Sequence, residues 1–359
     1  MSQVASNASQ PVFPTLVAPK RRSLTGDQLL GVAVRVAAVI VLVMLVSLVA
    51  VLLHASWPAW KSFGSEFVTS REWRPNELEV PKRDESGKIV YDADNEMVLT
   101  TMPARFGALA VIWGTSVSSV IALVIAVPLA LGAALFLVRL APGKLRGPVS
   151  FLIEFLAAVP SIAYGIWGLF VLVPLLRDYI EPAVLRGVRF LPGVGERAYQ
   201  FLGGDAGLSG RDMFCGGLIL GIMVLPIITA VSRDVLAAVP IHQIEGTLAL
   251  GATWWQSARQ MLGYAKAGLF GAIMLGLARA AGETMAVTMV IGNNNQISLS
   301  PFQPAQTMSS LLANEFGNPE SDMHRAALIA VALILLAMSL AFNVVARYLV
   351  IGRGPRRAS

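Results

Sequence analysis

The chain has 359 residues, of which 55% are hydrophobic and only 14% are charged, and its mean hydropathy is +0.65. Because soluble domains carry about 25% charged residues, this composition excludes an ordinary soluble globular protein and favours a polytopic membrane protein. The net charge of +6 indicates basic cytoplasmic loops rather than a nucleic-acid partner. The single cysteine, Cys215, excludes an internal disulfide framework, and the three histidines lie too far apart to form a metal-ligand spacing.

The amino-terminal part divides into three segments. Residues 1–28 are polar and rich in Ser, Pro and Ala, which predicts a disordered cytoplasmic tail. Segment 29–53 is apolar over a run longer than that of a signal peptide, so we expect an uncleaved transmembrane helix. Segment 54–104 is charged and predicts an extracytoplasmic insertion, in which the Ser86-Gly87 turn favours a short hairpin. A solvated surface insertion is the simpler interpretation, and docking of a partner is the alternative.

Five more apolar segments complete an all-α polytopic fold with six transmembrane helices. Their prolines, such as Pro128 and Pro160, are tolerated in a membrane bundle because neighbouring helices satisfy the freed carbonyl groups. A basic cytoplasmic tail, 353–359, follows the last of them. The five predicted spans lie near 108–138, 149–176, 213–231, 267–291 and 326–351.

The distribution of charge predicts the orientation. With the amino terminus inside, the inner segments hold almost only basic residues, and their acidic residues are limited to Asp27, Asp234 and Glu245. This positive-inside pattern places both termini in the cytoplasm. The inner basic residues are Lys20, Arg21, Arg22, Arg139, Lys144, Arg146, Arg233, Arg259, Lys266, Arg347, Arg353, Arg356 and Arg357.

Enzymatic motifs are absent from the sequence. It contains no Gly-x-x-x-x-Gly-Lys-Ser/Thr phosphate loop, no His-Glu-x-x-His and no Gly-x-Ser-x-Gly. We therefore expect no catalytic residues, no metal site and no cofactor bound by this chain.

Two charged residues lie inside the predicted span 267–291. Arg279 is near its midpoint, where a charge costs about 2.5–3.5 kcal/mol on insertion scales. Glu283 is four residues later, on the same face of a continuous helix, so the two side chains can pair. They either lock two helices together or face a transport pathway, which is the default interpretation of an intramembrane charge. The planar donors of arginine suit an oxyanion such as phosphate.

Weaker candidates lie in the predicted span 149–176. Ser161 and Tyr164 follow Pro160 and could line a cavity. Glu154 is close to the cytoplasmic side, so we expect it to be solvated or paired with Arg139, Lys144 or Arg146.

The predicted cytoplasmic loop 232–266 is unusually apolar. It favours a short helix, a break at Gly251 and a second helix capped by Thr253. Trp254 and Trp255 add apolar surface, which indicates either a docking site for another protein or packing against the chain's own helix ends.

Three segments carry a resemblance to a known family. Segment 154–170 reads Glu-Phe-Leu-Ala-Ala-Val-Pro-Ser-Ile-Ala-Tyr-Gly-Ile-Trp-Gly-Leu-Phe, and segment 278–287 reads Ala-Arg-Ala-Ala-Gly-Glu-Thr-Met-Ala-Val. Both resemble the phosphate permeases of bacterial ABC importers, the PstC family, over residues 105–352. Segment 245–252 is similar to the Glu-Ala-Ala-x-x-x-Gly signature of such permeases, with Gly246 and Thr247 in place of the alanines.

The resemblance implies a type I ABC importer permease, multi-pass in the bacterial inner membrane. It implies that Arg279 and Glu283 take part in phosphate transfer, and that Glu245 and Gly251 belong to the loop that couples to the ATPase. The implied partners are a homologous permease (PstA), two PstB ATPases and the extracytoplasmic phosphate-binding protein PstS. ATP and Mg²⁺ would bind to the partner ATPase, and membrane lipid would surround this chain.

Three alternatives remain open from the residues alone. One is the permease of another importer, for molybdate or sulfate, because a midplane arginine does not separate these oxyanions. Another is a proton-driven secondary anion carrier with Glu283 as the proton site. The third is an intramembrane enzyme that acts on a lipid phosphate, which would need a catalytic constellation that the sequence does not show.

Overall fold

The computed structural model of the chain describes residues 24–81, 99–190, 192–204 and 207–351. The chain divides into two units, residues 1–51 and 52–359. The described part of the first unit is a stretch of helix α1 (Leu24–Phe63) that exposes apolar side chains on every side. A helix that is apolar all round is typical of a membrane span.

Helix α1 is longer at both ends than the predicted span 29–53. It begins at Leu24, so residues 24–28 are helical rather than part of the tail, and it continues through residues 54–63, which were expected in the insertion. Residues 1–23 lie outside the described residues, and so does the carboxyl-terminal tail from 352 onward.

In the second unit, a small region of strands follows the end of α1 and the short helix α2. Its described strands form two antiparallel pairs, β1 with β4 and β2 with β3. The predicted Ser86-Gly87 turn falls between β2 and β3, outside the described residues. We call Glu66–Phe106 the outer segment, after its predicted location. Its elements are α2 (Glu66–Thr69), β1 (Trp73–Arg74), β2 (Leu78–Pro81), β3 (Leu99–Met102) and β4 (Arg105–Phe106).

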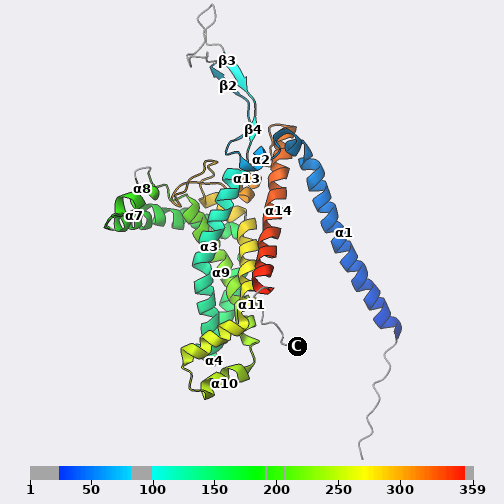
Figure 1. Cartoon of the computed structure of the whole chain (residues 1–359), viewed down its shortest axis with the longest axis vertical. Helices are drawn as coiled ribbons and strands as arrows, with labels where there is room; N and C mark the ends of the chain where they lie inside the picture. The colour runs from blue at the N-terminus through cyan, green and yellow to red at the C-terminus, as the bar shows by residue number, and fades with distance from the viewer. Residues whose placement is uncertain (1–23, 82–98, 191, 205–206, 352–359) are drawn as a thin grey trace, which may run out of the picture. The chain divides into compact units, whose positions relative to one another are not determined.

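The rest of the second unit is helical, and α3, α9 and α11 pack against one another (Figure 1). Three short stretches, η1 to η3, have π-helical hydrogen bonding. The elements are α3 (Leu109–Leu135), η1 (Phe136–Leu140), α4 (Gly143–Ala158), α5 (Ser161–Trp167), η2 (Gly168–Leu172), α6 (Val173–Leu175), η3 (Leu176–Ile180), α7 (Glu181–Arg189), α8 (Gly195–Phe201), α9 (Met213–Ala237), α10 (Ile241–Ala249), α11 (Trp254–Gly282), α12 (Met285–Val290), α13 (Met308–Glu315) and α14 (Asp322–Ile351).

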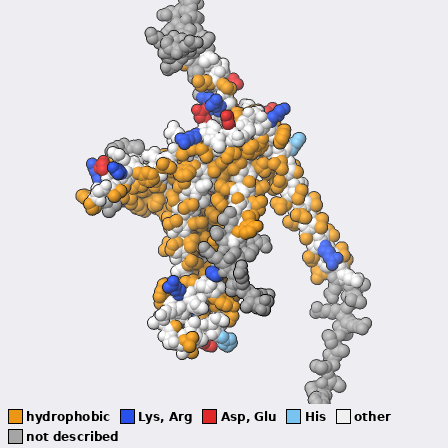
Figure 2. All heavy atoms as spheres, viewed as in Figure 1, with side chains coloured by type: hydrophobic (Ala, Val, Ile, Leu, Met, Phe, Trp, Pro, Cys, Tyr) orange, Lys and Arg blue, Asp and Glu red, His pale blue; other side chains and the backbone are white. Residues whose placement is uncertain are grey.

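Five helices of the described residues are long and apolar enough to cross a membrane, and a sixth crossing is possible if one bent pair counts as a span. The bent pair replaces the predicted straight span 149–176: Gly143–Ala158 and Ser161–Arg189 meet at 89°. Pro160 explains the bend, because proline has no N–H and forces the preceding residue, Val159, out of the helical region to ψ 131°. Orange apolar side chains cover much of the visible face of the helical region (Figure 2).

Small residues set the distance between α3 and α9. Ala122, Ala126 and Ala130 are fully buried on one face of α3. On α9, a Cβ at Gly217 would lie 2.5 Å from the side chain of Ile121. Close backbone approach of this kind is the usual way in which helices associate within a membrane.

Gly114→Ala is expected to destabilise the protein, whereas Gly132→Ala on the same helix is not. A Cβ at Gly114 would overlap the backbone carbonyl group of Gln306, which cannot rotate away, and a Cβ at Gly132 would meet nothing within 4 Å. Overpacking costs typically about 1–3 kcal/mol. Thermal unfolding in detergent measures the effect; equal midpoints for the two variants would contradict this packing.

Candidate functional site

A break in a long helix forms the centre of the candidate site. Helix α11 ends at Gly282, Glu283 has the extended dihedrals φ −71° and ψ 131°, and α12 begins at Met285. The predicted continuous span 267–291 is therefore two helices. Glycine and β-branched threonine lower helix propensity, and Gly282 and Thr284 flank the turning point.

Hydroxyl groups bond to two carbonyl groups at the break, and one of these, that of Thr284, also accepts from the N–H of Thr288 at 3.1 Å. Ser309 Oγ donates to the carbonyl oxygen of Glu283 at 2.6 Å, and Thr288 Oγ1 donates to that of Thr284 at 2.6 Å. Irregular backbone at membrane depth is tolerated where it is buried in protein or lines a cavity.

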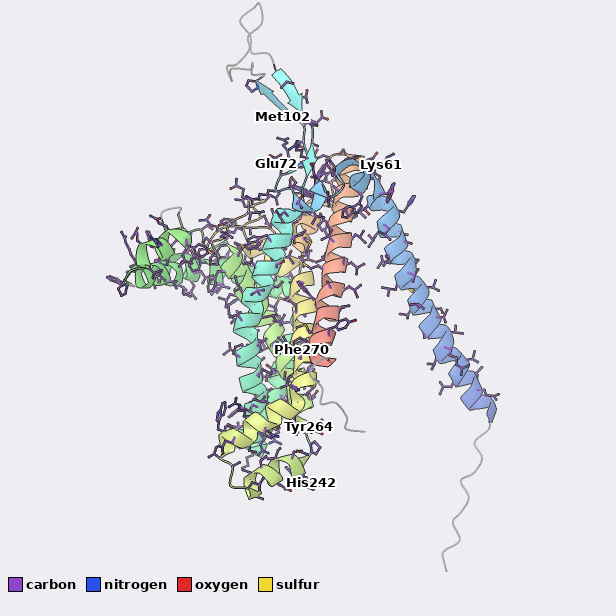
Figure 3. The ribbon with its side chains drawn as sticks, viewed as in Figure 1. Lys61, Glu72, Met102, His242, Tyr264 and Phe270 are labelled. Atoms are coloured by element: carbon purple, nitrogen blue, oxygen red, sulfur yellow. The ribbon has the colours of Figure 1, made fainter. Side chains whose placement is uncertain are left out.

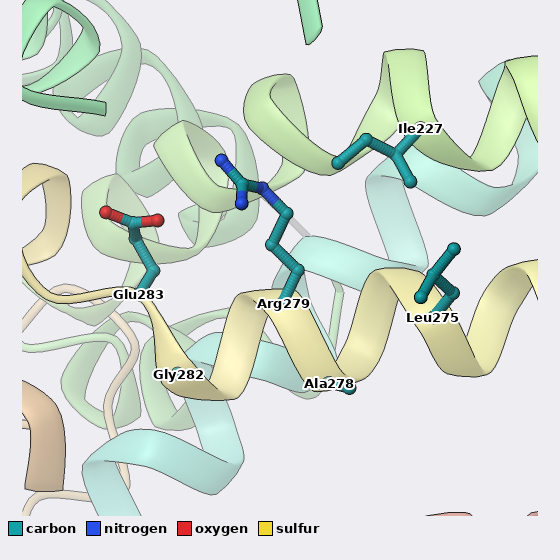
Figure 4. A pocket seen from close by; sticks show the side chains of 6 residues that line it. All are labelled: Ile227, Leu275, Ala278, Arg279, Gly282 and Glu283. Carbon is teal, nitrogen blue, oxygen red and sulfur yellow. The ribbon is translucent and has the colours of Figure 1, made fainter. Parts of the chain in front are cut away.

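A cavity of about 490 Å³ opens beside this break. Its walls are apolar except for Arg279 and Glu283, whose side chains point to the same side of the chain (Figure 4). Arg279 is exposed, and Glu283 is only 8% exposed. The cavity thus presents the five donors of one guanidinium beside one carboxylate. The lining residues are Ile227, Leu275, Ala278, Arg279, Gly282 and Glu283.

The possible ion pair between Arg279 and Glu283 does not form in this structure. Among the residues described, no nitrogen–oxygen distance between the two side chains falls within 4.0 Å. The expected pairing assumed a continuous helix from residue 279 to 283, and the break removes that geometry. Arg279 is therefore not held by Glu283 and is available to another anion.

Ser161 and Tyr164 do not line this cavity. Ser161 is the first residue of α5, and Tyr164 donates its hydroxyl to the carbonyl oxygen of Leu156 at 2.9 Å, across the Pro160 bend. Ile227 and Ser309 belong to the site but were not identified from the sequence. Ile227 is one of many apolar residues in α9, and the contact of Ser309 joins residues 26 positions apart.

Glu154 pairs with a residue that was not among its expected partners. Its carboxylate lies 3.1 Å from Arg233 Nη1, which comes from the last part of α9. The expected partners Arg139, Lys144 and Arg146 were wrong, because α4 packs against α9 and brings residues 79 positions apart together. The expectation of a solvated side chain is confirmed, since Glu154 is 57% exposed.

The region between α9 and α11 follows the expected helix–break–helix pattern. Helix α10 is followed by Gly251 with φ +80°, a left-handed conformation that favours glycine, and Thr253 caps α11 through a reciprocal pair of bonds with Gln256. The capping and the break are confirmed. The predicted loop 232–266 itself is mostly helical, because α9 extends to Ala237 and α11 begins at Trp254.

Helix α10 packs on α11 through Ile244 and the half-buried Thr247, whose hydroxyl group bonds to that of Ser257 at 3.3 Å, and most of its other side chains are exposed. Ile244 is buried against α11, whereas Leu250 is 90% exposed and Trp255 is also exposed. Glu245 is exposed, and its nearest ionic partner is His242 at 3.7 Å, which Figure 3 labels on α10. The loop packs on its own helices through Ile244, as one interpretation expected, and the docking of another protein on its exposed surface stays a prediction.

Residues 122–352 match the family described as "Binding-protein-dependent transport system inner membrane component". The chain belongs to this permease family. Among its relatives, the "Phosphate transport system permease protein PstC" of Mesorhizobium japonicum is 38% identical over 92% of this chain and 91% of its own length. The protein of that name from Haemophilus influenzae is 37% identical over 87% of this chain and 89% of its own length. A "Probable phosphate transport system permease protein PstC" from Methanocaldococcus jannaschii is 36% identical over 68% and 76%, respectively.

The family match covers both parts of the candidate site. The cavity and α10 lie within residues 122–352, whereas α1 and the outer segment lie before them. The permease is a multi-pass protein of the bacterial inner membrane with the type I ABC importer fold, and it is a transport subunit rather than an enzyme. Membership of this family implies an ABC transporter with separate ATPase and substrate-binding partners.

Proposed function

We propose that this chain is the transmembrane permease subunit of an ATP-driven importer of inorganic phosphate and that it forms half of the translocation pathway. The observation that carries this proposal is Arg279, an unpaired arginine that faces an apolar cavity at a break in a membrane helix. The named function of the relatives supports phosphate as the anion.

The chemistry of the cavity fits transient binding of an oxyanion. The guanidinium of Arg279 offers parallel N–H donors that match two phosphate oxygens. Glu283, on the same wall, repels a second negative charge and limits the affinity. A transport site must bind strongly enough to admit the ion and weakly enough to release it.

The partners follow from the proposed function. PstA would supply the other half of the pathway, PstS would deliver phosphate from outside, and two PstB subunits would hold ATP and Mg²⁺. The exposed surface of α10 around Glu245, with Gly251 as its end, fits a site that docks on the ATPase. Hydrolysis there would switch the two permeases between outward-open and inward-open states.

Uptake of radiolabelled phosphate into proteoliposomes that contain the whole complex tests the function. We expect uptake that requires ATP and loaded binding protein and that excess sulfate or molybdate does not inhibit. Inhibition by those anions would favour a permease for another oxyanion. Uptake by this chain alone, without ATP and with a proton gradient, would favour a secondary carrier with Glu283 as the proton site.

A further inference from the structure

Helix α13 lies between the break at Glu283 and the outer segment, and it is bonded at both ends. It packs against α12, α3 and α14 (Figure 1). Its eight residues span about 12 Å at 1.5 Å per residue. A helix this short does not bend appreciably, so its two ends move together.

The first end of α13 holds the break. Ser309, which is 4% exposed, donates to the Glu283 carbonyl oxygen at 2.6 Å. The same turn is fixed by Thr307, which caps the helix through Ser310, and by the N–H of Met308, which donates to Thr115 Oγ1 of α3 at 2.9 Å. The hydroxyl groups at this end, those of Thr115, Thr307, Ser309 and Ser310, are all buried. Loss of one bond therefore leaves a polar group that water cannot satisfy.

The other end of α13 holds the outer segment. Glu315 Oε2 accepts from Trp73 Nε1 at 2.9 Å and lies 2.9 Å from Nε2 of His324. His324 Nδ1 accepts from the N–H of Glu320 at 3.1 Å, so in the neutral ring Nε2 carries the hydrogen and donates to Glu315. One carboxylate therefore joins α13 to strand β1 and to the start of α14.

The bond from Trp73 reaches the rest of the outer segment through strand pairing. Trp73 is the cross-strand partner of Phe106, and their rings meet edge to face with centroids 5.2 Å apart. Phe106 in turn stacks on His324 at 5.5 Å. Bonds and ring contacts therefore connect the outer segment to Glu315.

We propose that α13 links the outer segment mechanically to the break at Glu283, with Ser309 as a positioning residue that holds the Glu283 backbone. The proposal deepens the proposed function, since it rests on Glu283 lining the substrate path. Movement of the outer segment then changes the cavity. Loss of either attachment, the bond of Ser309 to Glu283 or that of Trp73 to Glu315, loosens the break.

A thiol reporter in the cavity tests the link without phosphate. The sole cysteine is removed by Cys215→Ala, and Ala278→Cys places a thiol on the cavity wall. The complete transporter is assembled in lipid nanodiscs, and reaction with a membrane-impermeant methanethiosulfonate reagent is timed. We expect Ser309→Ala and Trp73→Phe each to raise the labelling rate about threefold to tenfold, as expected for the loss of one buried hydrogen bond.

The double variant decides whether the two attachments act through one helix. Effects at distant, independent sites multiply, so a link predicts that Trp73→Phe with Ser309→Ala labels no faster than the faster single variant. Ser118→Ala is the control, because the buried Ser118 hydroxyl group bonds, among the described residues, only to the carbonyl oxygens of Gly114 and Thr115 in its own helix, α3. This control should leave the labelling rate unchanged. Ser309→Thr keeps the hydroxyl group and should label at the rate of the protein with Ser309.

The proposal is overturned if the two single effects multiply, or if Ser118→Ala opens the cavity as much as Ser309→Ala. Should Trp73→Phe fail to assemble, Glu315→Leu replaces it and should give the same rise, because it removes the oxygen that accepts from Trp73 and His324. The labelling readout is separate from transport. The single variants could label faster, with no further rise in the double variant, in a transporter that takes up no phosphate. That result would refute the proposed substrate and support the link.

Discussion

Arg279→Gln is expected to reduce ATP-driven phosphate uptake by about 10- to 100-fold while the complex still assembles. The exposed guanidinium is the only positive group among the residues that line the cavity, and a charge-assisted hydrogen bond contributes more than a neutral one. Among the described residues Arg279 makes no ion pair, so its replacement breaks none. Radiolabelled uptake into proteoliposomes measures the effect, with assembly checked by pull-down.

Two matched variants make this result specific. Arg259→Gln removes an exposed arginine from the first part of the same helix, outside the cavity, and should leave uptake unchanged. Arg279→Lys keeps the charge but loses the planar fork, and should give an intermediate rate. Normal uptake by Arg279→Gln would remove this residue from the anion path and leave the substrate assignment supported only by similarity to the relatives.

Glu245→Ala is expected to reduce the stimulation of ATP hydrolysis by loaded binding protein about tenfold. Basal hydrolysis should persist. The Glu245 side chain is 64% exposed and contacts His242 at 3.7 Å, so its loss should not unfold α10. Interface residues of this kind can contribute strongly to binding when a partner covers them. Hydrolysis by the reconstituted complex is compared with and without loaded binding protein.

His242→Gln is the control for this second prediction. It removes the other member of the surface pair and keeps a polar side chain of similar size, so stimulation should remain close to that of the native complex. Full stimulation with Glu245→Ala would contradict a coupling role for this residue and would leave α10 as a helix that merely packs on α11 through Ile244.

Some features of the permease could be predicted because they depend on neighbouring residues. Thr253 and Gln256 are three positions apart, so the capping bond at the start of α11 is visible in the sequence. Gly251 marks the end of α10 in the same way, since only glycine adopts φ +80° without strain. The apolar runs identified the membrane helices, although α1 and α9 continue beyond their apolar limits.

The break at Glu283 shows where this reasoning fails. The sequence from 267 to 291 is apolar enough for one helix, and the i, i+4 spacing of Arg279 and Glu283 then predicts a pair. The structure instead stabilises the extended Glu283 backbone with a hydroxyl group from Ser309, which lies on a different helix. Local propensity cannot register a partner supplied by a distant segment.

The sequence by itself determined that this chain is a multi-pass membrane protein and an ABC importer permease, and it singled out Arg279, Glu283, Glu245 and Gly251. The membrane helices follow from the summed hydropathy of about 20 consecutive residues, and the permease assignment follows from the resemblance of short motifs to a known family; both kinds of signal are local. Only the tertiary structure decided that Arg279 stands unpaired in a cavity, that Glu154 binds Arg233, and that α13 joins Trp73 to Glu283. Each of these depends on which distant side chain satisfies a buried polar group, and that choice is made when the helices pack.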